Sequence, residues 1–211
     1  MINNHGTEST YSPSLTVICG PMRSGKSKEL FSIIDRLNYR KIHYKIFKPR
    51  LDSRNMDNIS SRYYSQSSKA IIIDEKNPKE ILSHFKEQFP KGTTALVDEA
   101  HFFSGELVEA VKTLLSDGVD VVISGLDCDA HMNTFGPMGD LLALAGKVVK
   151  LNSVCEFCYN SANFSALKDE EQSFTRENIL VGNDQYLVLC LSCYLEHIRR
   201  MEKKSLKNIY R

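Results

Sequence analysis

One segment of the chain combines glycines, a lysine and a hydroxyl group at the spacing of a phosphate-binding loop. Its residues are Gly20, Pro21, Met22, Arg23, Ser24, Gly25, Lys26 and Ser27, which fit the pattern G-x-x-x-x-G-K-[ST]. Glycines let backbone N–H groups converge on phosphate oxygens, and the start of a helix adds a favourable dipole. Lys26 would reach the β- and γ-phosphates, and Ser27 could bind Mg²⁺. The pattern favours a nucleoside triphosphate site over a purely structural glycine turn.

A second candidate feature is an apolar run that ends in two acids. Asp98 and Glu99 directly follow Ala95-Leu96-Val97. Paired acids at a strand end often form only a solvated turn. A phosphate-binding loop in the same chain changes that interpretation, because such loops work with an acid that holds Mg²⁺. We therefore expect Asp98 and Ser27 to hold Mg²⁺, and Glu99 to act on a nucleophile.

Four of the six cysteines form two Cys-x-x-Cys pairs, which are Cys155 with Cys158 and Cys190 with Cys193. Four thiolates in two such pairs can close a tetrahedral Zn²⁺ site with no open position for catalysis. Residues 159–189 separate the pairs, a longer interval than in usual zinc ribbons, so the metal would hold the base of a long loop. The alternative is four reduced thiols in a small core. Cys19 and Cys128 are expected to be buried free cysteines.

Short apolar runs alternate with helical patterns from Leu15 onward. The expected strands are Leu15–Cys19, Ile42–Phe47, Ala70–Ile73, Thr94–Val97, Val119–Ile123 and Lys147–Leu151. The expected helices are Lys26–Asn38, Pro78–Phe89 and Gly105–Ser116. Strands that alternate with helices and are apolar throughout predict an α/β fold with a buried parallel sheet.

This alternation stops after Leu151, where polar residues and the cysteine pairs begin. We therefore divide the chain into four parts. These are a disordered N-terminal tail at 1–14, an α/β nucleotide-binding domain at 15–151, a zinc-binding domain at 152–196 and a basic C-terminal tail at 197–211.

Composition limits the possible partners and location. With 27 Lys and Arg against 26 Asp and Glu, the net charge is +1 and gives no overall attraction to polyanions. The basic residues near 197–204 are interpreted as a solvated helix end. No apolar run has the length of a membrane span, and residues 1–14 lack the hydrophobic stretch of a signal peptide. These features predict a cytoplasmic protein with no nucleic-acid or membrane partner.

Several motifs follow one another in order along the chain. They are Gly20-Pro21-Met22, Val97-Asp98-Glu99-Ala100-His101-Phe102-Phe103, Gly125-Leu126-Asp127, Phe135-Gly136-Pro137 and Val181-Gly182-Asn183-Asp184-Gln185-Tyr186. From about Leu15 to Tyr194 the chain resembles the type II thymidine kinases. The resemblance implies a RecA-like P-loop core with a small zinc-binding lasso domain. It also implies ATP-dependent 5′-phosphorylation of thymidine to dTMP.

The resemblance further implies roles for individual residues. Glu99 would be the general base that accepts the proton of the 5′-hydroxyl group. Asp52 and Arg54 would match a D-x-R pattern near the phosphates, and His101 would join Asp98 and the phosphate loop in the ATP site. The residues that would bind the nucleoside are Met22, Phe102, Leu126, Ala130, Ser165, Ile179, Leu180, Val181, Gly182 and Tyr186.

The chain departs from the family pattern at positions that border the expected site. Arg23 replaces an aromatic residue, His101 replaces glutamine, Ala130 replaces phenylalanine and Leu167 replaces a basic residue. An alanine in place of an aromatic ring at position 130 would weaken nucleoside binding by on the order of 1 kcal/mol. A kinase with altered nucleoside preference, for deoxyuridine or an analogue, is therefore one alternative.

The implied ligands and partners are ATP, thymidine, structural Zn²⁺, Mg²⁺ with ATP, dTTP as a feedback inhibitor and further copies of the chain in a homotetramer. A regulatory P-loop protein that binds ATP without kinase activity is a second alternative. Asp98-Glu99-Ala100-His101 also spells the D-E-A-H of one helicase group. A helicase would need a second motor domain and a basic strand-binding surface, for which the chain has no room.

Overall fold

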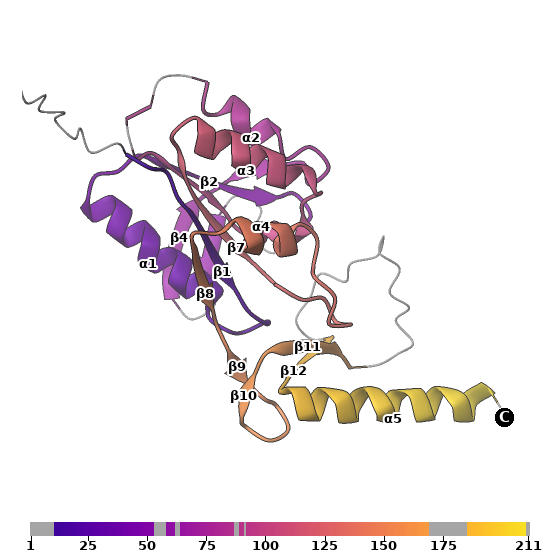
Figure 1. Cartoon of the computed structure of the whole chain (residues 1–211). Coiled ribbons are helices and arrows are strands. Elements are labelled where there is room, and N and C mark those ends of the chain that lie inside the picture. Colours follow the sequence, from indigo (N-terminus) through magenta and orange to yellow (C-terminus); the bar gives the residue numbers. More distant parts are fainter. Residues whose placement is uncertain are drawn as a thin grey trace, which may run out of the picture.

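The computed structural model describes residues 11–52, 58–61, 64–86, 89–90, 92–168 and 185–209. Its centre is a six-stranded sheet in the order β5-β2-β6-β7-β1-β8 (Figure 1). These strands are β1 (Leu15–Cys19), β2 (Tyr44–Pro49), β5 (Ile71–Ile73), β6 (Thr94–Val97), β7 (Asp120–Gly125) and β8 (Lys147–Lys150). Every neighbouring pair is parallel. The predicted α/β fold with a central parallel sheet is therefore confirmed.

Helices cover both faces of this sheet (Figure 1). They are α1 (Lys26–Tyr39), α2 (Glu80–Ser83), α3 (Glu106–Ser116) and α4 (Met138–Leu144), with a 3-10 turn η1 at Ala100–Phe102. Successive strand residues point to opposite faces. In β1, Val17 joins the core beneath α3 and α4, whereas Ile18 joins the core beneath α1. Burial on both faces explains why the strands are apolar throughout.

The expected helix Pro78–Phe89 is much shorter in the structure, where α2 has a single turn. Just after α2 the Lys45 ammonium group donates to the His84 carbonyl oxygen at 2.6 Å, and residues 87–88 of the expected helix lie outside the described residues. In a continuing helix that oxygen would accept from the backbone four residues later. The same ammonium group lies 5.5 Å from the centre of the Phe85 ring, so tertiary contacts override the helical pattern.

Part of the predicted N-terminal tail contacts the start of β7. Tyr11 and Ser14 fall in the predicted disordered tail, yet both contact Asp120 at the start of β7. The Ser14 backbone N–H and hydroxyl donate to Asp120 Oδ1 at 2.8 and 2.9 Å, and the Tyr11 hydroxyl donates to Oδ2. These contacts attach the last part of the predicted N-terminal tail to the start of β7.

Residues 152–168 and 185–209 form a smaller unit, here named the cysteine module (Figure 1). It contains the antiparallel pairs β9 (Ser153–Val154) with β10 (Ser161–Ala162) and β11 (Phe164–Leu167) with β12 (Tyr186–Leu189), followed by α5 (Leu191–Ile209). A separate apolar cluster holds it together, with Val188, Leu189 and Tyr194 at its centre. The predicted division between residues 196 and 197 falls inside α5, so the basic segment begins as part of one continuous helix.

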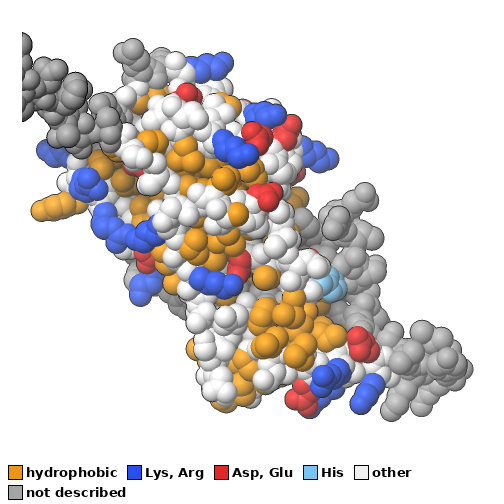
Figure 2. Space-filling model, viewed as in Figure 1, with side chains coloured by type: hydrophobic (Ala, Val, Ile, Leu, Met, Phe, Trp, Pro, Cys, Tyr) orange, Lys and Arg blue, Asp and Glu red, His pale blue; other side chains and the backbone are white. Residues whose placement is uncertain are grey.

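A third antiparallel pair, β3 (Asn58–Ser61) with β4 (Tyr64–Lys69), precedes β5 and was not expected. On the face shown in Figure 2, basic and acidic side chains are interspersed. Apolar side chains also gather on that face. The exposed large apolar residues of the described chain include Leu144, Val148, Phe157 and Leu195. Among the described residues, no helix has both the length and the apolar character needed to cross a bilayer.

Candidate functional site

The expected phosphate loop connects β1 to α1 at the carboxyl edge of the sheet. Gly20 has φ +139°, and a Cβ atom there would lie 2.2 Å from the Leu151 carbonyl oxygen. Gly25 has φ +91° and immediately precedes α1. Both positions need glycine, because other residues rarely adopt these conformations. The two glycines of the motif thus turn the chain so that the start of α1 faces the site.

Lys26 begins α1, and its side chain lies along the loop. Its ammonium group donates to the carbonyl oxygens of Gly20 at 3.0 Å and Pro21 at 2.7 Å. Burial lowers the pKa of Lys26, and the nearby Glu99 and Asp98 carboxylates oppose that shift. The Ser24 hydroxyl is buried and lacks a hydrogen-bond partner among the described residues, which fits a group that donates to a phosphate oxygen. The structure therefore brings the loop, its lysine and the two acids together.

Asp98 and Glu99 follow β6, two strands away from the phosphate loop. The Asp98 backbone N–H donates to the Phe47 carbonyl oxygen at 2.9 Å, so β2 holds this strand end. Burial, followed by the negative charge of Glu99, raises the pKa of Asp98 to about 7. Glu99 has φ +50°, a left-handed conformation that few residues other than glycine adopt. Such strain is concentrated at functional sites, where surrounding structure maintains it.

His101 lies beneath Glu99 and is 2% exposed. Its Nδ1 accepts a hydrogen bond from the Leu126 backbone N–H at 3.1 Å. That nitrogen therefore carries a lone pair, and the ring proton is on Nε2. Nδ1 also lies 3.7 Å from Glu99 Oε2. Nδ1 therefore faces the Glu99 carboxylate while it accepts from the Leu126 N–H.

Two further ion pairs lie at the same edge of the sheet and were not predicted. Lys48 Nζ lies 3.5 Å from Asp52 Oδ2, and the Lys48 side chain is only 2% exposed. Lys150 Nζ lies 2.9 Å from Asp127 Oδ2, and this contact raises the pKa of Lys150. Charged residues at or just after the ends of β2, β7 and β8 were the available signal, because the carboxyl ends of parallel strands form ligand sites.

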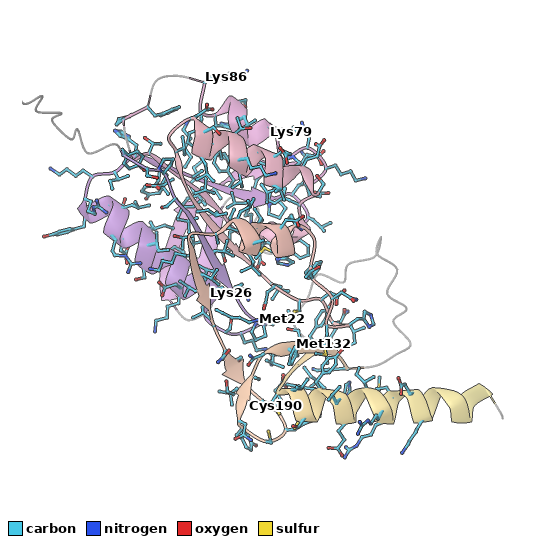
Figure 3. All side chains as sticks on the ribbon, in the orientation of Figure 1. Met22, Lys26, Lys79, Lys86, Met132 and Cys190 are labelled. Carbon is cyan, nitrogen blue, oxygen red and sulfur yellow. The ribbon has the colours of Figure 1, made fainter. Side chains whose placement is uncertain are left out.

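Six of the ten residues expected to bind the nucleoside are described, four of them before the cysteine module and two, Ser165 and Tyr186, within it. The Met22 backbone N–H donates to Ser165 Oγ at 3.1 Å, and Figure 3 shows Met22 between Lys26 and Cys190. Phe102 stacks beside His101 with ring centres 4.1 Å apart. Leu126 follows β7 directly.

Ala130 and Tyr186 complete the described part of this region. Ala130 is buried, and its carbonyl oxygen accepts from the Tyr194 hydroxyl of α5 at 2.8 Å. Tyr186 begins β12, and burial raises its pKa to about 12. One position beyond the Leu167–Tyr186 pair, on the side of the segment that connects β11 to β12, the Lys168 backbone N–H donates to the Gln185 carbonyl oxygen at 2.9 Å. Five predicted site residues lie outside the described residues: Arg54, Ile179, Leu180, Val181 and Gly182.

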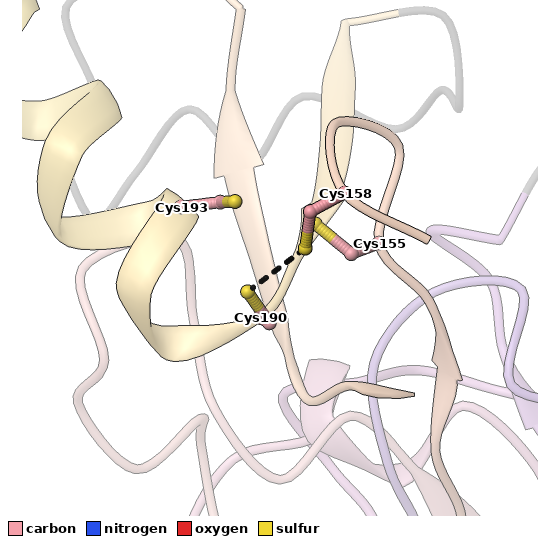
Figure 4. Close-up of side chains that lie close together, drawn as sticks. All are labelled: Cys155, Cys158, Cys190 and Cys193. Carbon is pink, nitrogen blue, oxygen red and sulfur yellow. Dashed lines mark hydrogen bonds between the residues drawn. The ribbon is translucent and has the colours of Figure 1, made fainter. Parts of the chain in front are cut away.

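The four paired cysteines converge in the cysteine module (Figure 4). Their Sγ atoms all lie within 4.8 Å of one another, and those of Cys158 and Cys190 are 3.6 Å apart. Zn–S bonds of about 2.3 Å in a tetrahedron separate the sulfurs by about 3.8 Å, so the arrangement fits Zn²⁺. Burial opposes ionisation of Cys155, but backbone N–H groups outweigh it and lower the pKa of this thiol to about 6. The cluster can hold a metal ion.

The two other cysteines differ from each other. Both are free thiols, but Cys19 is buried whereas Cys128 is partly exposed. The expectation of a buried thiol is therefore confirmed for Cys19 and is wrong for Cys128. Cys128 lies in the turn after β7, where it pairs with Thr134 through an isolated bridge. That turn leaves its side chain within reach of solvent.

Comparison with known proteins places this arrangement in a family. The family described as thymidine kinase matches residues 13–194. A thymidine kinase from Bacteroides thetaiotaomicron is 34% identical over 195 residues, which cover 91% of this chain and 92% of that protein. The chain belongs to the thymidine kinase family. A second thymidine kinase, from Mycoplasma genitalium, is 42% identical over 142 residues, covering 67% of this chain and 64% of that protein.

Solved structures give a more distant likeness. The genome packaging NTPase B204 from Sulfolobus turreted icosahedral virus 2 in complex with ATP-gammaS is 16% identical, with a TM-score of 0.45, and the match covers 66% of this chain and 74% of that one. Membership of the thymidine kinase family confirms the resemblance inferred from the ordered motifs.

Proposed function

We propose that this chain transfers the γ-phosphoryl group of ATP to the 5′-hydroxyl group of thymidine, giving dTMP and ADP. The observation that carries this proposal is the convergence of the phosphate loop with Asp98 and Glu99 at one sheet edge, beside residues of the cysteine module. Family membership supports thymidine as the acceptor. Phosphoryl transfer asks mainly for positioning and charge neutralisation, and this edge supplies both.

In this proposal Glu99 is the general base. Its carboxylate accepts the proton of the 5′-hydroxyl group as that oxygen forms a bond to the γ-phosphorus. The bond between the γ-phosphorus and the bridging oxygen to the β-phosphate breaks, and ADP leaves. A general base of this kind contributes about 10²- to 10⁴-fold to the rate. The place of Glu99 next to Asp98, at the sheet edge that carries the phosphate loop, supports this role.

The remaining residues of the edge would bind ATP and its metal. Lys26 would neutralise phosphate oxygens together with the loop N–H groups, and Asp52 and Arg54 would act near the phosphates. Ser27 and Asp98 would hold Mg²⁺, which supplies charge neutralisation at the phosphates when bound. Asp98 fits this role, since a carboxyl group with a raised pKa gains most from a cation beside it.

We also propose that the cysteine module holds structural Zn²⁺ through Cys155, Cys158, Cys190 and Cys193. Thymidine would lie between Met22, Phe102, Leu126 and the β11–β12 hairpin, with Ser165 and Tyr186 at its border and residues 179–182 contributing backbone groups. Ala130 would leave more room at the base than phenylalanine. Preference for deoxyuridine or an analogue is therefore the second candidate.

The experiment that tests the proposed function measures ADP formation with ATP and Mg²⁺ against a panel of nucleosides. Strict dependence on thymidine with formation of its 5′-monophosphate is expected. Dependence on another nucleoside would keep the kinase and change its substrate. ATP hydrolysis without any nucleoside dependence would favour a regulatory ATP-binding protein and contradict the proposal.

Family membership also supports three proposals about the protein as a whole. These are a homotetramer, feedback inhibition by dTTP and a cytoplasmic location. Mass measurement in solution tests the first, and inhibition of the transfer assay by dTTP tests the second. A monomer, or an activity indifferent to dTTP, would contradict the respective proposal.

A further inference from the structure

The tip of the phosphate loop is fastened to the cysteine module. The Met22 backbone N–H donates to Ser165 Oγ in β11 at 3.1 Å. The Ser153 hydroxyl of β9 donates to the Arg23 carbonyl oxygen at 3.3 Å. The Arg23 guanidinium Nη1 donates to Glu156 Oε1 at 2.8 Å. Three separate points of the module thus contact two adjacent residues of the loop.

Glu156 connects these contacts to the cysteine cluster. The same Oε1 atom also accepts from the Val188 backbone N–H at 2.8 Å, and the Glu156 backbone N–H donates to the Val188 carbonyl oxygen at 3.0 Å. Glu156 directly follows Cys155, and Val188 lies two residues before Cys190. One carboxylate therefore joins the segments that carry both cysteine pairs to the side chain of Arg23.

The conformation of the loop makes this contact matter for phosphate binding. Arg23 has φ +59°, an unfavourable conformation for a residue other than glycine. The loop must keep that conformation if its N–H groups are to point toward phosphate oxygens. Two contacts help to hold Arg23 in this conformation. They are the ion pair of its guanidinium group with Glu156 and the hydrogen bond that its carbonyl oxygen accepts from Ser153.

We propose that Glu156 is a positioning residue that couples metal binding in the cysteine module to ATP binding at the phosphate loop. Zn²⁺ fixes the segment that carries Glu156, Glu156 fixes Arg23, and the loop is held in the shape that accepts phosphate. Coupling between two binding sites is reciprocal, so bound ATP must also retain the metal. The inference rests on the proposed Zn²⁺ and ATP sites.

The exposure of the Arg23 and Glu156 side chains sets the expected size of the coupling between the metal site and the ATP site. The Arg23 and Glu156 side chains are 36% and 32% exposed, so water partly screens their attraction. Ion pairs of this kind correspond to changes of up to about fivefold in an equilibrium constant. Affinity changes of this size fall mainly on the dissociation rate, so we expect ATP to slow zinc loss by about two- to fivefold.

The test measures the rate at which the zinc-loaded full chain gives up Zn²⁺ to the chromogenic chelator 4-(2-pyridylazo)resorcinol. The rate is measured with and without a non-hydrolysable ATP analogue and Mg²⁺. In Glu156→Gln the amide oxygen can still accept from the Val188 N–H, but the charge facing Arg23 is removed. The analogue should slow zinc release in the wild type and have almost no effect in Glu156→Gln. The variant should also show a KM for ATP raised about two- to fivefold, with kcat nearly unchanged.

Glu106→Gln is the matched control. Glu106 forms an exposed ion pair with Lys79 at 3.1 Å, and Figure 3 shows Lys79 far from Met22 and Cys190. This control should behave as the wild type does. Equal slowing in the wild type and Glu156→Gln, or no slowing in the wild type, overturns the coupling. If the wild type holds Zn²⁺ and phosphorylates thymidine in that case, the proposed function stands while the coupling fails. A wild type that retains no Zn²⁺ overturns both the proposed metal site and the coupling.

Discussion

Replacing His101 by leucine tests the interpretation of the histidine as a hydrogen-bond acceptor. Leucine keeps an apolar side chain beside Phe102 but removes Nδ1, so the Leu126 N–H at 3.1 Å no longer has that acceptor. Leaving a buried amide unsatisfied costs about 1–3 kcal/mol. Glutamine, by contrast, offers an oxygen that can accept from the same N–H. We expect His101→Leu to lower the free energy of unfolding by about 1–3 kcal/mol and His101→Gln to lower it by less than about 1 kcal/mol.

Urea unfolding with Zn²⁺ present measures both variants against the wild type, from the shift of the midpoint at an unchanged slope. His43→Leu is the control, because His43 is exposed and a surface change alters stability by only about 0.5 kcal/mol or less. Equal destabilisation in the leucine and glutamine variants of His101 would refute the acceptor role. The Nε2–H tautomer of His101 would then lack support.

Three further predictions concern the loop, the pocket and the metal. Gly20→Ala should abolish ATP binding measured by calorimetry, because its Cβ would lie 2.2 Å from the Leu151 carbonyl oxygen. The control Gly105→Ala should bind ATP normally, because a Cβ there meets no atom within 4 Å. Tyr194→Phe should raise the KM for thymidine up to about tenfold, since the hydrogen bond to the Ala130 carbonyl oxygen contributes about 0.5–1.5 kcal/mol; an unchanged KM would separate this contact from the pocket. Removal of Zn²⁺ with a chelator should lower the melting temperature of the protein. The rate of removal should rise as the pH falls, because protons compete with the metal for the thiolate ligands, and a pH-independent rate would contradict thiolate ligation.

The main motifs were predictable because each is local in sequence. Gly20 and Gly25 need their glycines for backbone conformations that the spacing already indicates. The place of Asp98 at a strand end was predictable because an apolar run precedes it. The cysteine pairs converge as their spacing predicts. In each case neighbouring residues carry the physical requirement, so the sequence pattern is sufficient.

The contacts that complete the site depend on residues far apart in the chain. Arg23 and Glu156 meet only because β8 lies beside β1 and leads into the cysteine module. Asp127 and Lys150 meet because their strands flank β1 in the sheet. Strand order is set by global packing, so no local pattern could have paired these residues.

Secondary structure prediction failed where tertiary contacts replaced helical hydrogen bonds. The apolar periodicity of Pro78–Phe89 favoured a long helix, but Lys45 takes the His84 carbonyl oxygen and packs near the Phe85 ring. In contrast, α4 has seven residues and buries only Met138 and Leu141, too short a pattern to be recognised. Helices of this length depend on packing rather than on propensity.

The most direct test of the account compares the wild type with Glu99→Gln in the nucleoside-dependent transfer assay. Glutamine keeps the size of the side chain and removes the proton acceptor. We predict thymidine-dependent dTMP formation by the wild type, a decrease of about 10²- to 10⁴-fold in kcat for Glu99→Gln, and ATP binding unchanged in the variant. Undiminished turnover in Glu99→Gln would contradict the mechanism, and a wild type without thymidine-dependent turnover would contradict the function.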